Sequence, residues 1–235
     1  MAKNILRYLN IYYWLRKFTF TKLFQKFSLI PNNIKRKIIF YFIFKSKHWR
    51  DYNKPLESES ISGLGSDLSV TKQIINELDV FIKKNKINSI LDVACGDYNW
   101  IKLLIKNNNN VTYHGLEIVN SIVENNKNLY SNSNITFSCS DVVKEDLPKN
   151  YDLVILRDFF IHIKNNDILM MLNKIKLSNC KYFAITNYPN INKNIEIKGY
   201  GHHRHINIEV SPFNLNNSFY KIDDYDKKLN IYKNL

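Results

Sequence analysis

The chain has 235 residues, of which 45% are hydrophobic and 23% charged, with only 6 glycines and 5 prolines. This composition excludes collagen-like and wholly disordered proteins and predicts a globular fold with a substantial core. The formal net charge is +13, because 34 basic residues stand against 21 acidic ones. Three isolated cysteines, Cys95, Cys139 and Cys180, indicate neither a zinc knuckle nor a disulfide framework, and a cytoplasmic location fits best.

The positive charge is concentrated at the N-terminus. Residues 1–50 hold 12 basic residues, no acidic residue and 13 aromatic ones, which leaves the other 22 basic residues against all 21 acidic ones. The longest apolar run, Ile38 to Phe44, is too short to span a bilayer. We therefore predict a basic aromatic N-terminal helical arm over residues 1–50, followed by a second domain over residues 51–235.

Three interpretations of the arm stay open. Helical periodicity in residues 3–17 and the lysine-flanked run at residues 38–44 are typical of helices that lie in a membrane interface, so residues 1–47 are predicted to contact an anionic membrane surface and to make the protein peripheral there. Alternatively, the same apolar residues pack on the second domain as a cap over a pocket. An RNA-binding surface is less well supported, because no RNA-binding fold signature accompanies the basic and aromatic residues.

Beyond the turn-rich loop of residues 51–69, predicted helices and strands alternate. Helices are predicted over 71–84, 100–105, 121–129 and around 168–175, and strands over 88–95, 111–117, 135–140, 152–156 and 182–186. The alternation predicts an α/β fold whose parallel sheet has helices on both faces. Two hydrophobic pieces around an acidic turn in residues 219–235 predict a closing antiparallel pair.

Acidic residues follow the predicted strands. Asp92 closes the first strand, and Glu117, Asp141 and Asp158 follow the next three. In open sheets of this kind, ligands bind beyond the carboxyl ends of the strands. Neither G-x-G-x-x-G nor a phosphate-binding loop motif is present, and acidic side chains repel phosphate. They suit a ligand with a cationic centre, a ribose diol and an amino group.

The stretch ILDVACGDYNW resembles the first motif of class I S-adenosylmethionine-dependent methyltransferases. The resemblance implies a Rossmann-like, mostly parallel sheet with an antiparallel C-terminal strand, and S-adenosyl-L-methionine as cofactor. It also implies that Glu117 binds the ribose and that Asp141 lies near the adenine amino group. The backbone around Gly96 and Asp97 is expected to hold the methionine carboxylate. The predicted cofactor-binding residues are Asp92, Ala94, Gly96, Asp97, Trp100, Glu117, Ile118, Asp141, Val142 and Arg157.

Two positions depart from the family's first motif, because Ala94 stands where many members have glycine and Tyr98 occupies the third glycine position. Residues 49–235 are similar to a bacterial-type subgroup with E-S-x-S-G-x-G-S, CGD-[FY]-N-W and R-D-x-x-x-H motifs. This closer resemblance implies modification of sugars or surface glycans. Gly63 and Gly65 in the first of these motifs are expected to let the loop bend over the cofactor as a lid.

Methyl transfer to a hydroxyl requires alignment of the acceptor and removal of its proton. His162 is the predicted base, with Asp158 one helical turn earlier as the group that orients its imidazole. The structural alternative makes Asp158 a helix cap and His162 a core residue. Arg204, Asn207 and His203 are predicted to bind the acceptor, with Arg204 clamping a phosphate or carboxylate.

A divalent metal held by His202, His205 and Asp158 matches no strong ligand spacing, so no metal ligands are predicted. The sequence as a whole predicts a methyltransferase that acts on an oxygen of a sugar, glycan or glycolipid-like acceptor. The alternatives are an RNA methyltransferase that uses the basic arm, and a catalytically inactive cofactor-binding interaction module.

Overall fold

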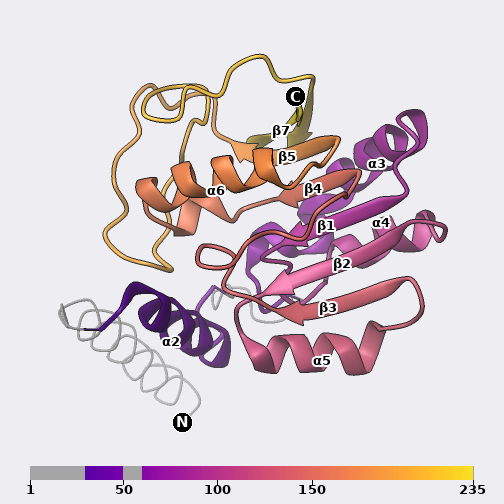
Figure 1. The fold of residues 1–235 in the computed structure, drawn as a ribbon, viewed down its shortest axis with the longest axis horizontal. Coiled ribbons are helices and arrows are strands. Elements are labelled where there is room, and N and C mark those ends of the chain that lie inside the picture. The colour runs from indigo at the N-terminus through magenta and orange to yellow at the C-terminus, as the bar shows by residue number, and fades with distance from the viewer. Residues whose placement is uncertain (1–29, 50–59, 235) are drawn as a thin grey trace, which may run out of the picture.

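The computed structural model describes residues 30–49 and 60–234, in which a seven-stranded sheet carries helices on both faces (Figure 1). The helices are α2 (Asn32–Lys45), α3 (Leu68–Lys84), α4 (Ile101–Asn107), α5 (Asn120–Tyr130) and α6 (Asn165–Leu177), with short 3-10 helices η1 (Leu64–Ser66) and η2 (Phe160–His162). The strands are β1 (Ser89–Val93), β2 (Thr112–Glu117), β3 (Ile135–Cys139), β4 (Leu153–Leu156), β5 (Tyr182–Asn187), β6 (Tyr220–Asp224) and β7 (Lys227–Lys233).

The sheet has the order β3-β2-β1-β4-β5-β7-β6. Strands β1 to β5 are parallel, whereas β7 is antiparallel to both β5 and β6. The predicted Rossmann-like sheet with an antiparallel C-terminal strand is confirmed. The strand order reverses between β1 and β4, so the carboxyl ends of these two strands form the crevice in which such sheets bind ligands.

The local sequence explains why the central strands are continuous apolar runs. All four residues of β4 and four of the five residues of β1 are buried, as expected for strands covered on both faces. One hydrophobic cluster packs α3 and α4 on one face, and a second packs α2 and α6 on the other. Strand β1 ends two residues before the predicted end because Ala94 has a φ of +62°, which breaks the extended backbone.

Helix α2 comes from the predicted arm and lies at the end of the sheet toward which β2 and β3 point (Figure 1). Its side chains Ile39, Phe40, Ile43 and Phe44 are buried in the same cluster as β4 and α6. These are residues that the membrane interpretation would place in lipid, and their burial instead matches the cap interpretation. Residues 1–29 of the predicted arm lie outside the described residues.

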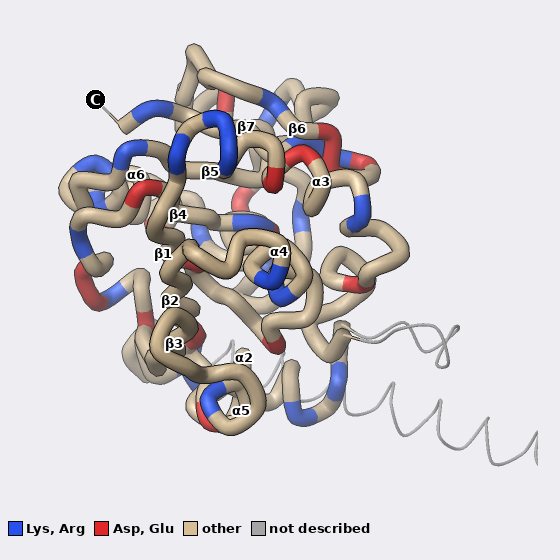
Figure 2. The backbone as a smooth tube through the Cα atoms, turned by 90° about the vertical axis from the view of Figure 1, so that its right-hand side faces the viewer, with Lys and Arg blue, Asp and Glu red and all other residues tan. Residues whose placement is uncertain are grey.

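Charge is distributed widely over the described chain. Lys and Arg occur on each of the five helices, and α3, α5 and α6 carry acidic residues as well (Figure 2). None of the helices in residues 30–49 and 60–234 has both the length and the apolar character needed to cross a membrane.

The contact between α2 and Gly201 predicts how firmly this helix is docked. Gly201 has a φ of +74°, and an added Cβ there would lie 2.2 Å from Ile43 Cδ1. We expect Gly201→Ala to lower the free energy of unfolding by about 1–3 kcal/mol, from left-handed backbone strain and overpacking. Urea unfolding measures this change. Ile43→Val removes the Cδ1 atom, so part of the loss should be recovered in the double variant; full additivity of the two changes would contradict the contact.

Candidate active site

A cavity of about 380 Å³ opens at the carboxyl ends of β1, β2 and β4. Twelve of the fifteen predicted site residues line it, and the three that do not are Asp97, Arg204 and Asn207. Its volume falls within the range of ordinary small-molecule sites. The strand ends therefore bring together side chains that are up to 111 positions apart in the sequence, from Asp92 to His203.

The end of β1 supplies a buried carboxyl group. Asp92 is 3% exposed and accepts a hydrogen bond from the Tyr113 hydroxyl at 2.8 Å. Burial raises the pKa of Asp92 to about 7, although the Tyr113 hydrogen bond and the charge of Arg157 oppose the rise. Two residues later, Ala94 has a φ of +62°, a left-handed backbone conformation that favours glycine.

Glu117 ends β2 and braces the turn after β1. Its Oε1 accepts hydrogen bonds from the backbone N–H groups of Ile118 at 2.8 Å and Val119 at 3.1 Å, and its Oε2 accepts one from Gly96 at 3.2 Å. Burial raises the pKa of Glu117 to about 7, against the lowering effect of these hydrogen bonds. Oε1 thus uses both of its acceptor sites, whereas Oε2 uses one and keeps a second that suits a hydroxyl of a ribose diol.

Asp97 contradicts the prediction that its backbone holds the methionine carboxylate. Its N–H donates to Ser62 Oγ at 3.1 Å, and its carboxylate accepts hydrogen bonds from Ser60 Oγ, Ile61 N and Ser62 Oγ at 2.8–2.9 Å. The Gly96 N–H is likewise engaged by Glu117. Asp97 thus fastens the preceding loop to the turn after β1, and three donors from that loop share its carboxylate.

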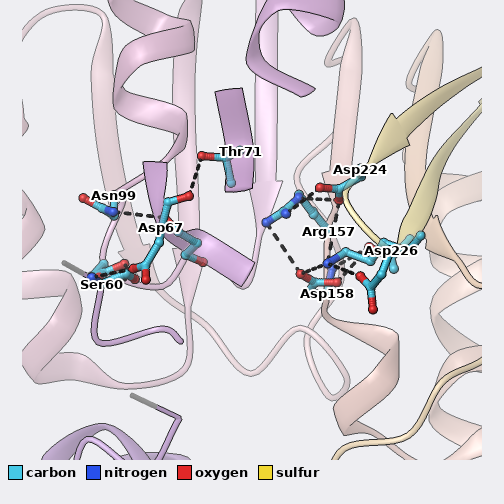
Figure 3. Close-up of polar contacts among 12 residues, drawn as sticks. Ser60, Asp67, Thr71, Asn99, Arg157, Asp158, Asp224 and Asp226 are labelled. Carbon is cyan, nitrogen blue, oxygen red and sulfur yellow. Dashed lines mark hydrogen bonds and ion pairs between the residues drawn. The ribbon is translucent and has the colours of Figure 1, made fainter. Parts of the chain in front are cut away.

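That loop closes one side of the cavity, as the lid prediction expects. On the left of Figure 3, the backbone N–H of Ser60 donates to Asp67 Oδ1, while Thr71 donates to the Asp67 carbonyl and Asn99 to the carbonyl of Ser66. The cavity is lined by residues 62–66. The loop lies close to the turn after β1, because a Cβ added at Gly96 would lie 2.3 Å from the hydroxyl oxygen of Ser62.

Asp141, the predicted partner of the adenine amino group, forms a buried ion pair with a residue of α2. Arg36 Nε lies 3.0 Å from Asp141 Oδ1, and Arg36 Nη2 lies 2.8 Å from Asp141 Oδ2. Both residues line the cavity, as do Ile118 and Val142 beside them. A planar guanidinium matches a carboxylate in this bidentate arrangement, which fixes the orientation of both groups.

His162 lies on η2 and lines the cavity. Its Nδ1 is 2.8 Å from the His202 carbonyl oxygen, and its ring stacks on Trp49 at a centroid distance of 4.6 Å. Because a carbonyl oxygen only accepts hydrogen bonds, Nδ1 carries the proton and Nε2 keeps its lone pair. Burial lowers the pKa of His162 to about 4, so the neutral form with a basic Nε2 is present at neutral pH.

Asp158 does not orient His162 as the sequence suggested. Its carboxylate instead belongs to a charged cluster, shown on the right of Figure 3, in which Lys227 lies 3.2 Å and Arg157 lies 3.5 Å from Asp158 Oδ2. Arg157 also makes two 2.8 Å hydrogen bonds to Asp224. Burial raises the pKa of Asp158, but the two cations outweigh it and lower the pKa. The predicted helical turn is also absent, because Asp158 has a φ of +56°.

Arg157 and Trp100 were both predicted to contact the cofactor, and both line the cavity. The Arg157 guanidinium lies over the Trp100 ring at 5.0 Å from its centroid, a cation–π distance. With its two bonds to Asp224, this cation is fixed on three sides. This fixed position suits a structural role for Arg157 in the wall of the cavity.

The prediction that Arg204 and Asn207 bind the acceptor is wrong in this structure. Arg204 donates to the carbonyl of Ile163 at 2.8 Å and to Asn165 Oδ1 at 2.7 Å, and it is 7% exposed. Asn207 donates to the Ile191 carbonyl at 2.9 Å and is likewise buried. Arg204 thus fastens the segment after β5 to the chain between η2 and α6, whereas Asn207 satisfies backbone carbonyls within that segment. Only the third predicted acceptor residue, His203, lines the cavity.

Sequence reasoning missed many cavity residues, and four of them come from the arm. The cap interpretation was the only signal for the α2 residues and Trp49, whereas nothing in the sequence marked the β6–β7 turn as part of a site. The missed lining residues include Arg36, Phe40, Phe44, Trp49, Tyr188, Tyr225, Asp226 and Lys227. Among the described residues, no group of three or more His, Cys, Asp or Glu side chains is placed to hold a metal ion.

Residues 90–177 match a family model described as a methyltransferase domain. Over these residues the chain is therefore similar to methyltransferase domains. A malonyl-[acyl-carrier protein] O-methyltransferase of Acetivibrio thermocellus is 31% identical over 86 residues, which are 37% of this chain and 30% of that protein. The chain thus spans less than a third of the length of this curated relative.

Two solved structures share the fold of the methyltransferase domain. The magnesium protoporphyrin IX methyltransferase of Synechocystis PCC 6803, solved with bound SAH, is similar over 84% of this chain and 99% of that one, with a TM-score of 0.56 and 13% identity. The PH0226 protein of Pyrococcus horikoshii OT3 is similar over 70% and 89%, with a TM-score of 0.53 and 18% identity. At these identities the likeness is one of fold alone.

The buried acids at the strand ends predict a pH-dependent cost to stability. When the pKa of a carboxyl is higher in the folded than in the unfolded state, the unfolded chain ionises first as pH rises. The free energy of unfolding therefore falls between about pH 4 and about pH 7. Asp92→Asn removes the ionisable group and with it this cost. We expect the change that it causes in the free energy of unfolding to be about 1–3 kcal/mol more stabilising at pH 8 than at pH 4.5. Urea unfolding at both pH values tests this, with exposed Glu124→Gln as control. Equal effects at the two pH values would contradict it.

Proposed function

We propose that this chain transfers a methyl group from S-adenosyl-L-methionine to a hydroxyl oxygen of a sugar, glycan or glycolipid-like acceptor. The observation that carries the proposal is the neutral His162 with a free Nε2, in the same cavity as the acidic ends of β1 and β2. S-adenosyl-L-methionine supplies an electrophilic methyl group on a sulfonium centre. In the transfer, the acceptor oxygen bonds to the methyl carbon, the sulfur leaves with the electron pair as a thioether, and His162 takes the hydroxyl proton.

The residues at the cofactor end fit this group. Asp92, Glu117 and Asp141 are acidic and buried, which suits a ligand with a cationic centre, two ribose hydroxyls and an amino group. The apolar residues Ile118 and Val142, each next in sequence to one of the last two acids, also line the cavity and provide surface for a flat ring. The same acids would repel the phosphate groups of a dinucleotide.

The acceptor end favours an uncharged, ring-shaped acceptor. Its walls include Trp49, Tyr188 and His205, and the last two stack at 4.0 Å with nearly parallel planes. Sugar rings present C–H groups that pack on aromatic faces. The cations at this end, Arg157 and Lys227, are each paired with aspartates, so the described wall offers little free positive charge for a phosphate-rich acceptor such as RNA.

The arm has two parts in this proposal. Residues 30–49 cap the cavity through α2 and Trp49 and belong with the methyltransferase domain. Contact with an anionic membrane rests on residues 1–29, whose sequence is basic and aromatic, and would hold the enzyme where glycolipid-like acceptors lie. Flotation with neutral and anionic vesicles tests this part, since retention on anionic vesicles at low salt is expected and its absence would remove the membrane from the proposal.

The cofactor is tested first, by thermal melting with S-adenosylhomocysteine. At 100 times its dissociation constant this ligand should stabilise the chain by about 2.7 kcal/mol and raise the melting temperature by about 5–10 °C. Glu117→Ala should abolish the shift, because the cavity loses its ribose acceptor, whereas exposed Glu124→Ala should keep it. A folded wild-type protein that shows no shift would refute the proposed activity.

The base is tested once a glycan screen has supplied an acceptor. His162→Gln should lower kcat by about 100–10,000-fold and leave S-adenosylhomocysteine affinity unchanged, because the ring acts on the acceptor. His202→Gln is the matched control, since it keeps the carbonyl that orients His162 and its side chain does not line the cavity. Wild-type kcat should stay level from pH 8 to about pH 5 and fall below that. Near-wild-type turnover in His162→Gln would exclude this base.

Salt-steep binding to polynucleotide that supports turnover would instead favour an RNA acceptor. Binding of the cofactor without transfer to any acceptor in the screen would favour an inactive interaction module.

A further inference from the structure

Arg36 is a buried cation in the wall of the cavity, and it comes from outside the matched methyltransferase domain. It is 4% exposed and lies on α2, 54 positions before the domain match begins at residue 90. Buried arginines are uncommon and keep their place only when their hydrogen bonds are satisfied. The partners of Arg36 therefore indicate why this helix carries it.

The ion pair leaves Asp141 with unused acceptor capacity. Arg36 Nε and Nη2 each engage a different oxygen of the Asp141 carboxylate, at 3.0 and 2.8 Å. An ionised carboxylate has about four acceptor sites, so the fork occupies about half of them. Asp141 is 1% exposed and lines the cavity, so the remaining sites are available to a ligand and not to bulk water.

The guanidinium is supported from behind by a second set of partners. Arg36 Nη1 donates to the Tyr200 hydroxyl at 3.2 Å, and that hydroxyl donates to Asp167 Oδ2 at 2.9 Å. The next residue, Gly201, lies directly against α2. Arg36 is thus held between α6, the segment after β5 and the end of β3, and its position fixes that of the Asp141 carboxylate.

We propose that Arg36 is a positioning residue for the cofactor, which turns the free acceptor sites of Asp141 toward the exocyclic amino group of the adenine ring. The inference rests on the proposed function and extends it to the arm, whose helix α2 becomes part of the cofactor site. Its consequence is specificity. A purine with a carbonyl oxygen in place of the amino group would set an acceptor against the fixed carboxylate and leave both unpaired, which is costly in a buried site.

The test compares two ligands and measures a ratio. Isothermal titration calorimetry gives dissociation constants for S-adenosylhomocysteine and for S-inosylhomocysteine, in which a carbonyl oxygen replaces the amino group. The wild-type chain should prefer the adenosyl ligand by roughly tenfold or more. Arg36→Met should reduce this preference by roughly fivefold or more, because Asp141 loses its fixed orientation. Lys37→Met, an exposed neighbour on the same helix, should leave both constants unchanged.

Each other outcome overturns a different statement. If Arg36→Met weakens both ligands by the same factor, the residue only docks α2 and the inference is wrong. A wild-type chain that binds both ligands equally also refutes it, because Asp141 then does not read the amino group. Failure of the wild-type chain to bind S-adenosylhomocysteine refutes the proposed function instead.

A second pair of variants keeps the inference testable if Arg36→Met fails to fold. Arg36→Lys keeps the charge but not the fork, so it should retain affinity for both ligands while losing part of the preference. Tyr200→Phe leaves the fork to Asp141 in place and removes the hydroxyl that links Arg36 to Asp167, so it should lower the preference less than Arg36→Lys does. An unchanged preference in both variants would overturn the inference.

Discussion

The structure depends on a single constraint at the carboxyl end of the sheet: several ionised groups lie in a space from which water is largely excluded. Isolated buried charges are costly, so each must have a fixed partner. Arg36 pairs with Asp141 at one end of the cavity, and Arg157 pairs with Asp224 at the other. The first pair holds α2 at the site and the second holds the β6–β7 hairpin there, although the two elements are far apart in the sequence.

Asp92 and Glu117 are stabilised differently, because their hydrogen-bond partners in the described chain are uncharged groups. Asp92 is held by one hydroxyl and Glu117 by three backbone N–H groups, and burial raises the pKa of both to about 7. Such an environment weakens the fold at neutral pH, where the unfolded chain ionises these groups more readily. A ligand with hydroxyl and cationic groups would offset that penalty, so binding and stability are coupled at these two residues.

The sequence predicted the sheet and the acidic strand ends in the cavity because both follow from short-range patterns. Apolar runs such as that of β4 identify the central strands, and acids directly after them must meet at one edge of a parallel sheet. Arg36 was not predictable, because it lies 105 positions from Asp141 and within a run of lysines that reads as a solvated face. Arg204 and Asn207 failed for a related reason: polar side chains of the long segment after β5 satisfy backbone carbonyls, before β5 for Arg204 and within the segment for Asn207.

The arrangement around His162 shows why the base did not need the aspartate that the sequence offered. A carboxylate hydrogen-bonded to the ring would raise its pKa and favour the charged form. The His202 carbonyl fixes the same tautomer without adding a charge, and Trp49 covers one face of the ring. Asp158 is meanwhile held by Lys227 in the neighbouring cluster. The imidazole therefore stays neutral and oriented at physiological pH, which is the state that a proton acceptor requires.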